Sequence, residues 1–132
     1  MDRFSYNKLA SGPDQQIIRL LELQPGKAEE ALRCSVTEVS LAETPEYEAI
    51  SYCWGLEQVA DRIICDDETY LPLNQSLSSA LRYFRHDQGP RLLWADAICI
   101  NQLDTDEKSR QVNMMRDVYR QSRRVLIWLG EE

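Results

Sequence analysis

The fold is decided by the stretch RLLWADAICINQLDTDEKSRQVNMMRDVYRQSRRVLIWLG, residues 91–130. Within it, Leu92–Ile100 is apolar except for Asp96. That run is too short to span a membrane and too continuous for a half-exposed strand, so it predicts a buried strand. Val125–Leu129 is a second apolar run and predicts another buried strand. We expect the two strands to be parallel neighbours.

A helix is predicted between these strands. Asp104 and Glu107 have the spacing of a capping box, in which a side-chain acceptor is followed three residues later by a carboxylate. After them the apolar residues recur at helical spacing and predict a face buried against the sheet. These residues are Val112, Met115, Val118 and Tyr119, and Met114 widens the stripe.

The first half of the chain reads as strands. Residues 1–14 are polar and interrupted by Gly12-Pro13, which predicts a surface lead-in. Gln16–Leu23 and Ala31–Leu41 are predicted strands that pair as a hairpin. Tyr47–Trp54 is a third predicted strand.

The middle of the chain predicts a hairpin followed by a helix. Arg62–Cys65 and Glu68–Leu71 flank the acidic pair Asp66-Asp67, which is typical of a hairpin tip. Asn74 or Ser76 can cap the helix that follows. Its apolar positions are Leu77, Ala80, Leu81 and Phe84.

Strands and helices alternate from Tyr47 onward, which favours an α/β fold with an open parallel sheet and helices packed on it. We expect the first two strands to add an N-terminal antiparallel extension at one edge of this sheet. The domain is predicted to cover residues 15–132, after the 1–14 lead-in. A sheet of this kind normally continues with a helix after the last strand, so we expect the domain to be truncated at its C-terminus.

Composition limits the classes of function. The chain has 132 residues and a formal net charge of -7, which argues against nucleic acid and anionic membrane surfaces as partners. No apolar run is long enough for a membrane span, and no signal peptide is recognisable. The four cysteines are scattered without a CxxC pair, which argues against a metal site. Buried reduced thiols favour a cytoplasmic protein.

Several polar and aromatic residues are predicted to meet at the carboxyl ends of the parallel strands, where open α/β sheets bind ligands. Asp96 lies within the first apolar run of the 91–130 stretch, and Asn101 and Gln102 follow it. Tyr52, Trp54 and Gly55 stand at the end of the third strand.

Three blocks of this sequence resemble the fungal heterokaryon-incompatibility (HET) domain. They are YEAISYCWG (residues 47–55), NQSLSSALRYFR (74–85) and LWADAICINQLDTDEKSRQVNMMRDVYRQSRRVLIWLG (93–130). The stretches IIRLLELQPG and RIICDD also fit that family, so the resemblance covers nearly the whole chain. Ala95 departs from it, since the family usually has a larger aliphatic residue there.

The resemblance implies a role in non-self recognition and programmed cell death, a form of innate immunity. HET domains are in turn similar to TIR domains, which implies a TIR-like or flavodoxin-like sheet. Some TIR domains hydrolyse NAD with a catalytic glutamate on the helix after the strand that corresponds to Val125–Leu129. This sequence has no matched residue for that glutamate, unless Glu131 or Glu132 begins the helix.

Cleavage of an N-glycosidic bond passes through an oxocarbenium-like state that a nearby carboxylate stabilises. Asp96 and Glu107 are therefore the candidate catalytic residues. Tyr52 or Trp54, with Gly55 beside them, would stack on a nucleotide ring, and Asn101 and Gln102 would bind its ribose or amide groups. NAD would be a substrate, and no cofactor is expected.

Each residue also has a structural interpretation. Asp96 can bond backbone N–H groups, Glu107 can close the capping box, and Trp54 can be a core aromatic. The alternative to an enzyme is a signalling module that acts by self-association or by binding other signalling domains. A third interpretation is a regulatory domain of a longer receptor.

Overall fold

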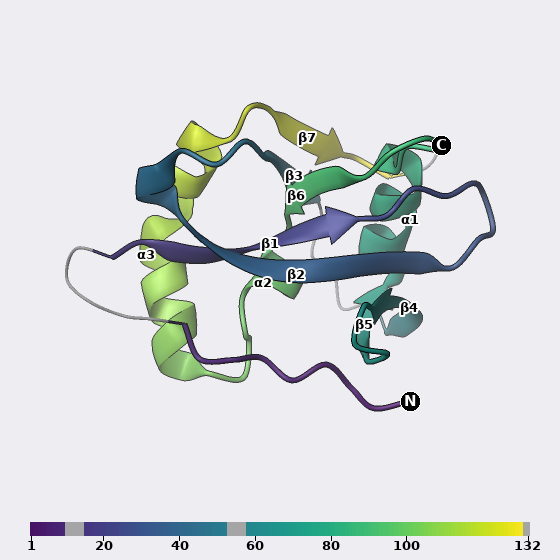
Figure 1. Cartoon of the computed structure of the whole chain (residues 1–132), viewed down its shortest axis with the longest axis horizontal. Helices are drawn as coiled ribbons and strands as arrows, with labels where there is room; N and C mark the ends of the chain where they lie inside the picture. The colour runs from purple at the N-terminus through teal and green to yellow at the C-terminus, as the bar shows by residue number, and fades with distance from the viewer. Residues whose placement is uncertain (10–14, 53–57, 131–132) are drawn as a thin grey trace.

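The computed structural model describes residues 1–9, 15–52 and 58–130. Within these ranges, seven strands form one mixed sheet accompanied by helices, an α/β architecture (Figure 1). The elements in chain order are β1 (Ile17–Leu23), β2 (Leu32–Ser40), the short 3-10 helix η1 (Leu41–Glu43), β3 (Glu48–Tyr52), β4 (Val59–Cys65), β5 (Tyr70–Asn74), α1 (Gln75–Phe84), β6 (Arg91–Trp94), α2 (Asp96–Cys99), α3 (Thr105–Gln121) and β7 (Val125–Trp128). No helix in the described ranges has the length and apolar character needed to cross a bilayer.

The first two strands lie in the middle of the sheet, whose order is β5-β4-β2-β1-β6-β3-β7. They form the predicted antiparallel hairpin, but the expectation that they extend one edge was wrong. β1 is also antiparallel to β6, so the sheet is mixed. The sequence of β1, IIRLLEL, explains its central place, because a nearly continuous apolar run suits a strand covered on both faces. Four of its side chains are fully buried: Ile18, Leu20, Leu21 and Leu23.

The parallel part predicted from residue 47 onward is the group β6-β3-β7. β3 is parallel to both β6 and β7 and lies between them, so the expectation that β6 and β7 are neighbours was wrong. Ala49 and Ile50 of β3 are fully buried, which suits an interior strand. β7 is the edge strand, and its Val125 and Ile127 are exposed, contrary to the prediction of a buried strand.

The apolar run Leu92–Ile100 is not one strand. β6 ends at Trp94, and Asp96 begins the single helical turn α2. Ile98 and Cys99 are nevertheless buried, because α2 packs against β1. A strand followed by a buried turn therefore produces the same apolar pattern as one long strand.

The predicted acidic hairpin and the helix after it are confirmed. β4 and β5 pair antiparallel, with Asp66-Asp67 in the turn. The side chain of Asn74 accepts a hydrogen bond from the Leu77 N–H at 2.8 Å and so caps α1. Leu77 and Leu81 are buried as the spacing predicts.

The N-terminus of α3 is capped by Asp104 as predicted, but its buried face differs from the expected stripe. Glu107, Gln111 and Val118 are buried, whereas Val112 is 49% exposed. Met115 and Tyr119, expected to be buried, are half-buried against the core. The expectation failed because two of the inward positions are polar, and hydrophobic periodicity does not register them.

The difference between Val118 and Val112 gives a matched pair of variants. Val118→Ala should lower the free energy of unfolding by about 2 kcal/mol, because it removes two buried methyl groups and leaves a cavity. Val112→Ala should change it by less than about 0.5 kcal/mol, the usual range for surface substitutions. Urea titration of both variants measures the difference, and equal losses would mean that the orientation of α3 is incorrect.

Candidate functional site

Asp96 lies where β6 gives way to α2, at the carboxyl edge of the parallel strands β6 and β3. It is half-buried, and two phenols lie near its carboxylate. Burial raises the pKa of Tyr52, and the charge of Asp96 and a hydrogen bond to its carboxylate raise that pKa further. Burial and then the charge of Asp96 also raise the pKa of Tyr119. The structure thus brings Asp96 and Tyr52 together.

Trp94, directly before this turn, adds a buried aromatic ring. It is fully buried, and its indole meets the Tyr119 ring edge to face, with centroids 5.5 Å apart. Among the described residues, no hydrogen-bond partner satisfies its Nε1–H. An unsatisfied buried donor of this kind is uncommon in folded proteins. Trp54 and Gly55 lie outside the described residues.

The amides of Asn101 and Gln102 serve the loop after α2. The Gln102 side chain donates to the backbone oxygen of Asp96 at 3.0 Å and to that of Ile100 at 3.4 Å. The Asn101 side-chain oxygen accepts from the Leu103 N–H at 3.2 Å, which is an Asx-type turn. Both amides therefore shape the loop that follows Asp96.

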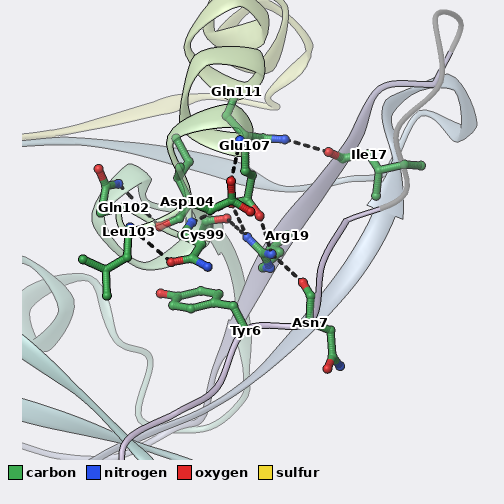
Figure 2. Close-up of polar contacts among 12 residues, drawn as sticks. Tyr6, Asn7, Ile17, Arg19, Cys99, Gln102, Leu103, Asp104, Glu107 and Gln111 are labelled. Atoms are coloured by element: carbon green, nitrogen blue, oxygen red, sulfur yellow. Dashed lines mark hydrogen bonds and ion pairs between the residues drawn. The ribbon is translucent and has the colours of Figure 1, made fainter.

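Glu107 occupies a different environment from Asp96. It is 1% exposed, and its two carboxylate oxygens each accept a hydrogen bond from Arg19 at 2.7 Å (Figure 2). One of them also accepts from the Asn101 N–H at 2.6 Å. Glu107 thus bonds the loop before the helix rather than the N–H of Asp104, as a standard capping box would. Its burial and this complete set of partners favour a structural role.

Arg19 is the residue at this centre that sequence reasoning missed. It lies in β1, is 2% exposed, and also donates to the backbone oxygens of Cys99 at 3.1 Å and Asn7 at 2.8 Å. The Tyr6 ring lies 4.7 Å from its guanidinium carbon (Figure 2). The Tyr6 hydroxyl donates to the Ile98 backbone oxygen at 2.7 Å. The signal was present, because an arginine inside an apolar central strand requires a buried partner.

A hollow that was not predicted from the sequence lies between α1 and β7 and measures about 1030 Å³. Asp61 lines it and accepts hydrogen bonds from Ser78 at 2.6 Å and from Arg82 at 3.0 Å. These donors hold the pKa of Asp61 below its usual value, although burial alone would raise it. Tyr83 and Trp128 add aromatic surface, with ring centroids 5.2 Å apart.

The ion pair between Arg19 and Glu107 yields a stability prediction. Glu107→Gln should lower the free energy of unfolding by roughly 3–5 kcal/mol, because it leaves the Arg19 guanidinium buried without a counter-charge. Asp106→Asn is the matched control on the same helical turn. Asp106 is exposed, so its loss should cost less than about 1 kcal/mol. Urea titration measures both, and a Glu107→Gln loss no larger than that of the control would contradict a structural role for the pair.

Comparison with known proteins identifies the family. The family model described as "Heterokaryon incompatibility protein (HET)" matches residues 47–132. The chain is also 36% identical over 140 residues to the heterokaryon incompatibility protein 6, OR allele, of Neurospora crassa. That alignment covers 96% of this chain but only 21% of the relative, so the chain spans about a fifth of the relative's length. No solved structure matches. The chain therefore belongs to the heterokaryon-incompatibility family.

Proposed function

We propose that this chain is a signalling domain in fungal non-self recognition and programmed cell death, with Asp96 at the centre of its functional site. The family and the relative from Neurospora crassa support the role. The observation that supports the site is the half-buried carboxylate of Asp96 beside the Tyr52 hydroxyl, at the carboxyl edge of β6 and β3. Because the chain has free buried thiols, we propose that it acts in the cytoplasm.

For the mechanism we propose TIR-like cleavage of the N-glycosidic bond of NAD. The Asp96 carboxylate would stabilise the positive charge that develops on the ribose as the nicotinamide leaves. The aromatic rings of Tyr52 and Tyr119 would border the planar base, and Trp54 and Gly55 follow Tyr52 in the sequence. The parallel group β6-β3-β7, with a carboxylate at its carboxyl edge, supports the TIR-like part of the proposal. In this scheme Glu107 positions the loop that carries Asn101 and Gln102.

The exposed edge strand β7 favours a second candidate function, which is self-association without catalysis. β7 is an edge strand whose outer side carries no further strand among the described residues. Three apolar side chains, at Val125, Ile127 and Leu129, are 41%, 62% and 92% exposed. An exposed apolar edge strand is a template for pairing with another strand. A second copy of this chain, or another signalling domain, would fit it.

The substitution Asp96→Asn tests the site. In fungal cells that express the chain, it should abolish the death response while the melting temperature of the purified protein stays within about 2 °C of wild type, since the side-chain shape is kept. The matched control is Asp87→Asn, an exposed aspartate after α1, which should leave both the response and the melting temperature unchanged. Full signalling by a folded Asp96→Asn protein would remove Asp96 from the site.

NAD turnover by the purified chain separates the two mechanisms. If Asp96 supports cleavage, nicotinamide release should fall by about 100-fold or more in Asp96→Asn and stay unchanged in Asp87→Asn. If turnover appears only at high protein concentration, cleavage requires self-association. Absence of turnover at every concentration, with a death response that still depends on Asp96, would favour the self-associating module and contradict cleavage.

A further inference from the structure

We propose that Cys34 and Cys65 form a redox-sensitive dithiol that a peroxide converts to a disulfide between strands β2 and β4. The two residues are register partners on these parallel strands, and their Sγ atoms lie 3.9 Å apart. Adjacent strands are about 4.8 Å apart, within the range of about 4.4–6.8 Å that disulfides span between Cα atoms. A small rotation of the side chains is therefore enough to bring the sulfurs into bonding distance.

The two thiols differ in reactivity. The Cys34 thiol donates a hydrogen bond to the Cys65 sulfur, which lowers the pKa of Cys65 and raises that of Cys34. Burial and the nearby Asp67 and Asp66 oppose the shift at Cys65, and a hydrogen bond from Thr69 reinforces it. Cys65 thus becomes a thiolate more readily and is the sulfur that attacks first.

A small oxidant has a route to the pair. Both cysteines are 2% exposed, but both line a hollow of about 240 Å³ at the surface. Arg33 and Glu68 border the same hollow. Hydrogen peroxide is small enough to enter such a space and reach the two sulfurs.

The reaction balances with hydrogen peroxide as the only co-reactant. The Cys65 thiolate attacks one peroxide oxygen, the O–O bond breaks, and with one proton taken up the products are a Cys65 sulfenic acid and water. The Cys34 sulfur then attacks the Cys65 sulfur, and the S–O bond breaks as the S–S bond forms. The hydroxyl leaves as water with the Cys34 proton. Two thiols lose two electrons in total, and one peroxide is reduced to two water molecules.

The bond would join two strands that pair over a short stretch. β2 and β4 share three register pairs, and the Cys34–Cys65 pair is the last of them. β4 and β5 lie on the outer side of the β2–β4 pairing. β4 carries Asp61, which lines the hollow beside α1. A disulfide would tie the β4–β5 hairpin to the centre of the sheet and close a loop between residues 31 positions apart. Restricting that loop in the unfolded chain should raise the melting temperature by roughly 5–15 °C.

Mass spectrometry of the purified chain tests the proposal. The reduced protein is treated with increasing hydrogen peroxide, free thiols are then blocked, and the intact mass and the linked peptides are measured. We expect a species that has lost two hydrogen atoms, a Cys34–Cys65 peptide, and a higher melting temperature that a reductant reverses. A disulfide that links other cysteines, or stepwise gain of oxygen at Cys65 without a link, would overturn the proposal.

Three variants serve as controls. Cys34→Ala and Cys65→Ala should each lose the linked species and the rise in melting temperature on oxidation. Cys99→Ala should retain both, because Cys99 lies in α2 and is not a register partner of either cysteine. Each variant is compared with its own reduced form, so an unrelated loss of stability does not affect the result. If Cys34→Ala still shows the reversible rise, another bond is responsible and the inference fails.

Discussion

The buried ion pair between Arg19 and Glu107 is the interaction on which the arrangement of this domain depends. Removing a guanidinium and a carboxylate from water costs several kcal/mol for each ion, and only close geometry offsets that cost. Here the pair is bidentate, with both contacts at 2.7 Å. Nη1 and Nη2 of Arg19 each also donate to a backbone oxygen, and Glu107 accepts one backbone N–H. The pair therefore fixes how α3 sits against β1, since a different register would leave two charges buried alone.

The same centre connects segments that are distant in the chain. The contacts of Arg19 include the backbone of Asn7 in the N-terminal segment and of Cys99 in α2 (Figure 2). Residues 1–9, part of the predicted surface lead-in, are mostly exposed, but Leu9 is buried and Tyr6 packs against Arg19. One charged side chain in the central strand thus organises the N-terminal segment, α2 and α3 together.

Much of the fold could be predicted because its signals are local. The caps at Asn74 and Asp104 and the acidic turn at Asp66-Asp67 follow from short-range chemistry. The order of the strands could not be predicted, because it depends on tertiary packing between segments that are distant in the sequence. The apolar sequence of β1 suits a central strand, but we expected this strand in an antiparallel extension at one edge. The prediction of one strand over Leu92–Ile100 was wrong for a related reason, since a buried turn is as apolar as a buried strand.

The candidate site shows the same contrast between residue types, which can be read from the sequence, and tertiary contacts, which cannot. From composition alone, Asp96 and Glu107 are equivalent carboxylates near one loop, and only burial and partners distinguish them. Glu107 uses both oxygens in fixed contacts. The backbone carbonyl oxygen of Asp96 accepts from the Ile100 N–H at 3.2 Å and from the Gln102 side chain at 3.0 Å.

Those contacts position Asp96 without using its carboxylate, and the hydrogen bond from the Tyr6 hydroxyl to Ile98 steadies the same turn. A carboxylate presented on a fixed backbone beside phenolic hydroxyl groups has the preorganisation that a binding or catalytic site requires. Arg19, Glu107 and Gln102 then act on Asp96 only through its position. Changes at these three residues should alter stability and signalling together, whereas a change at the Asp96 carboxylate can separate the two.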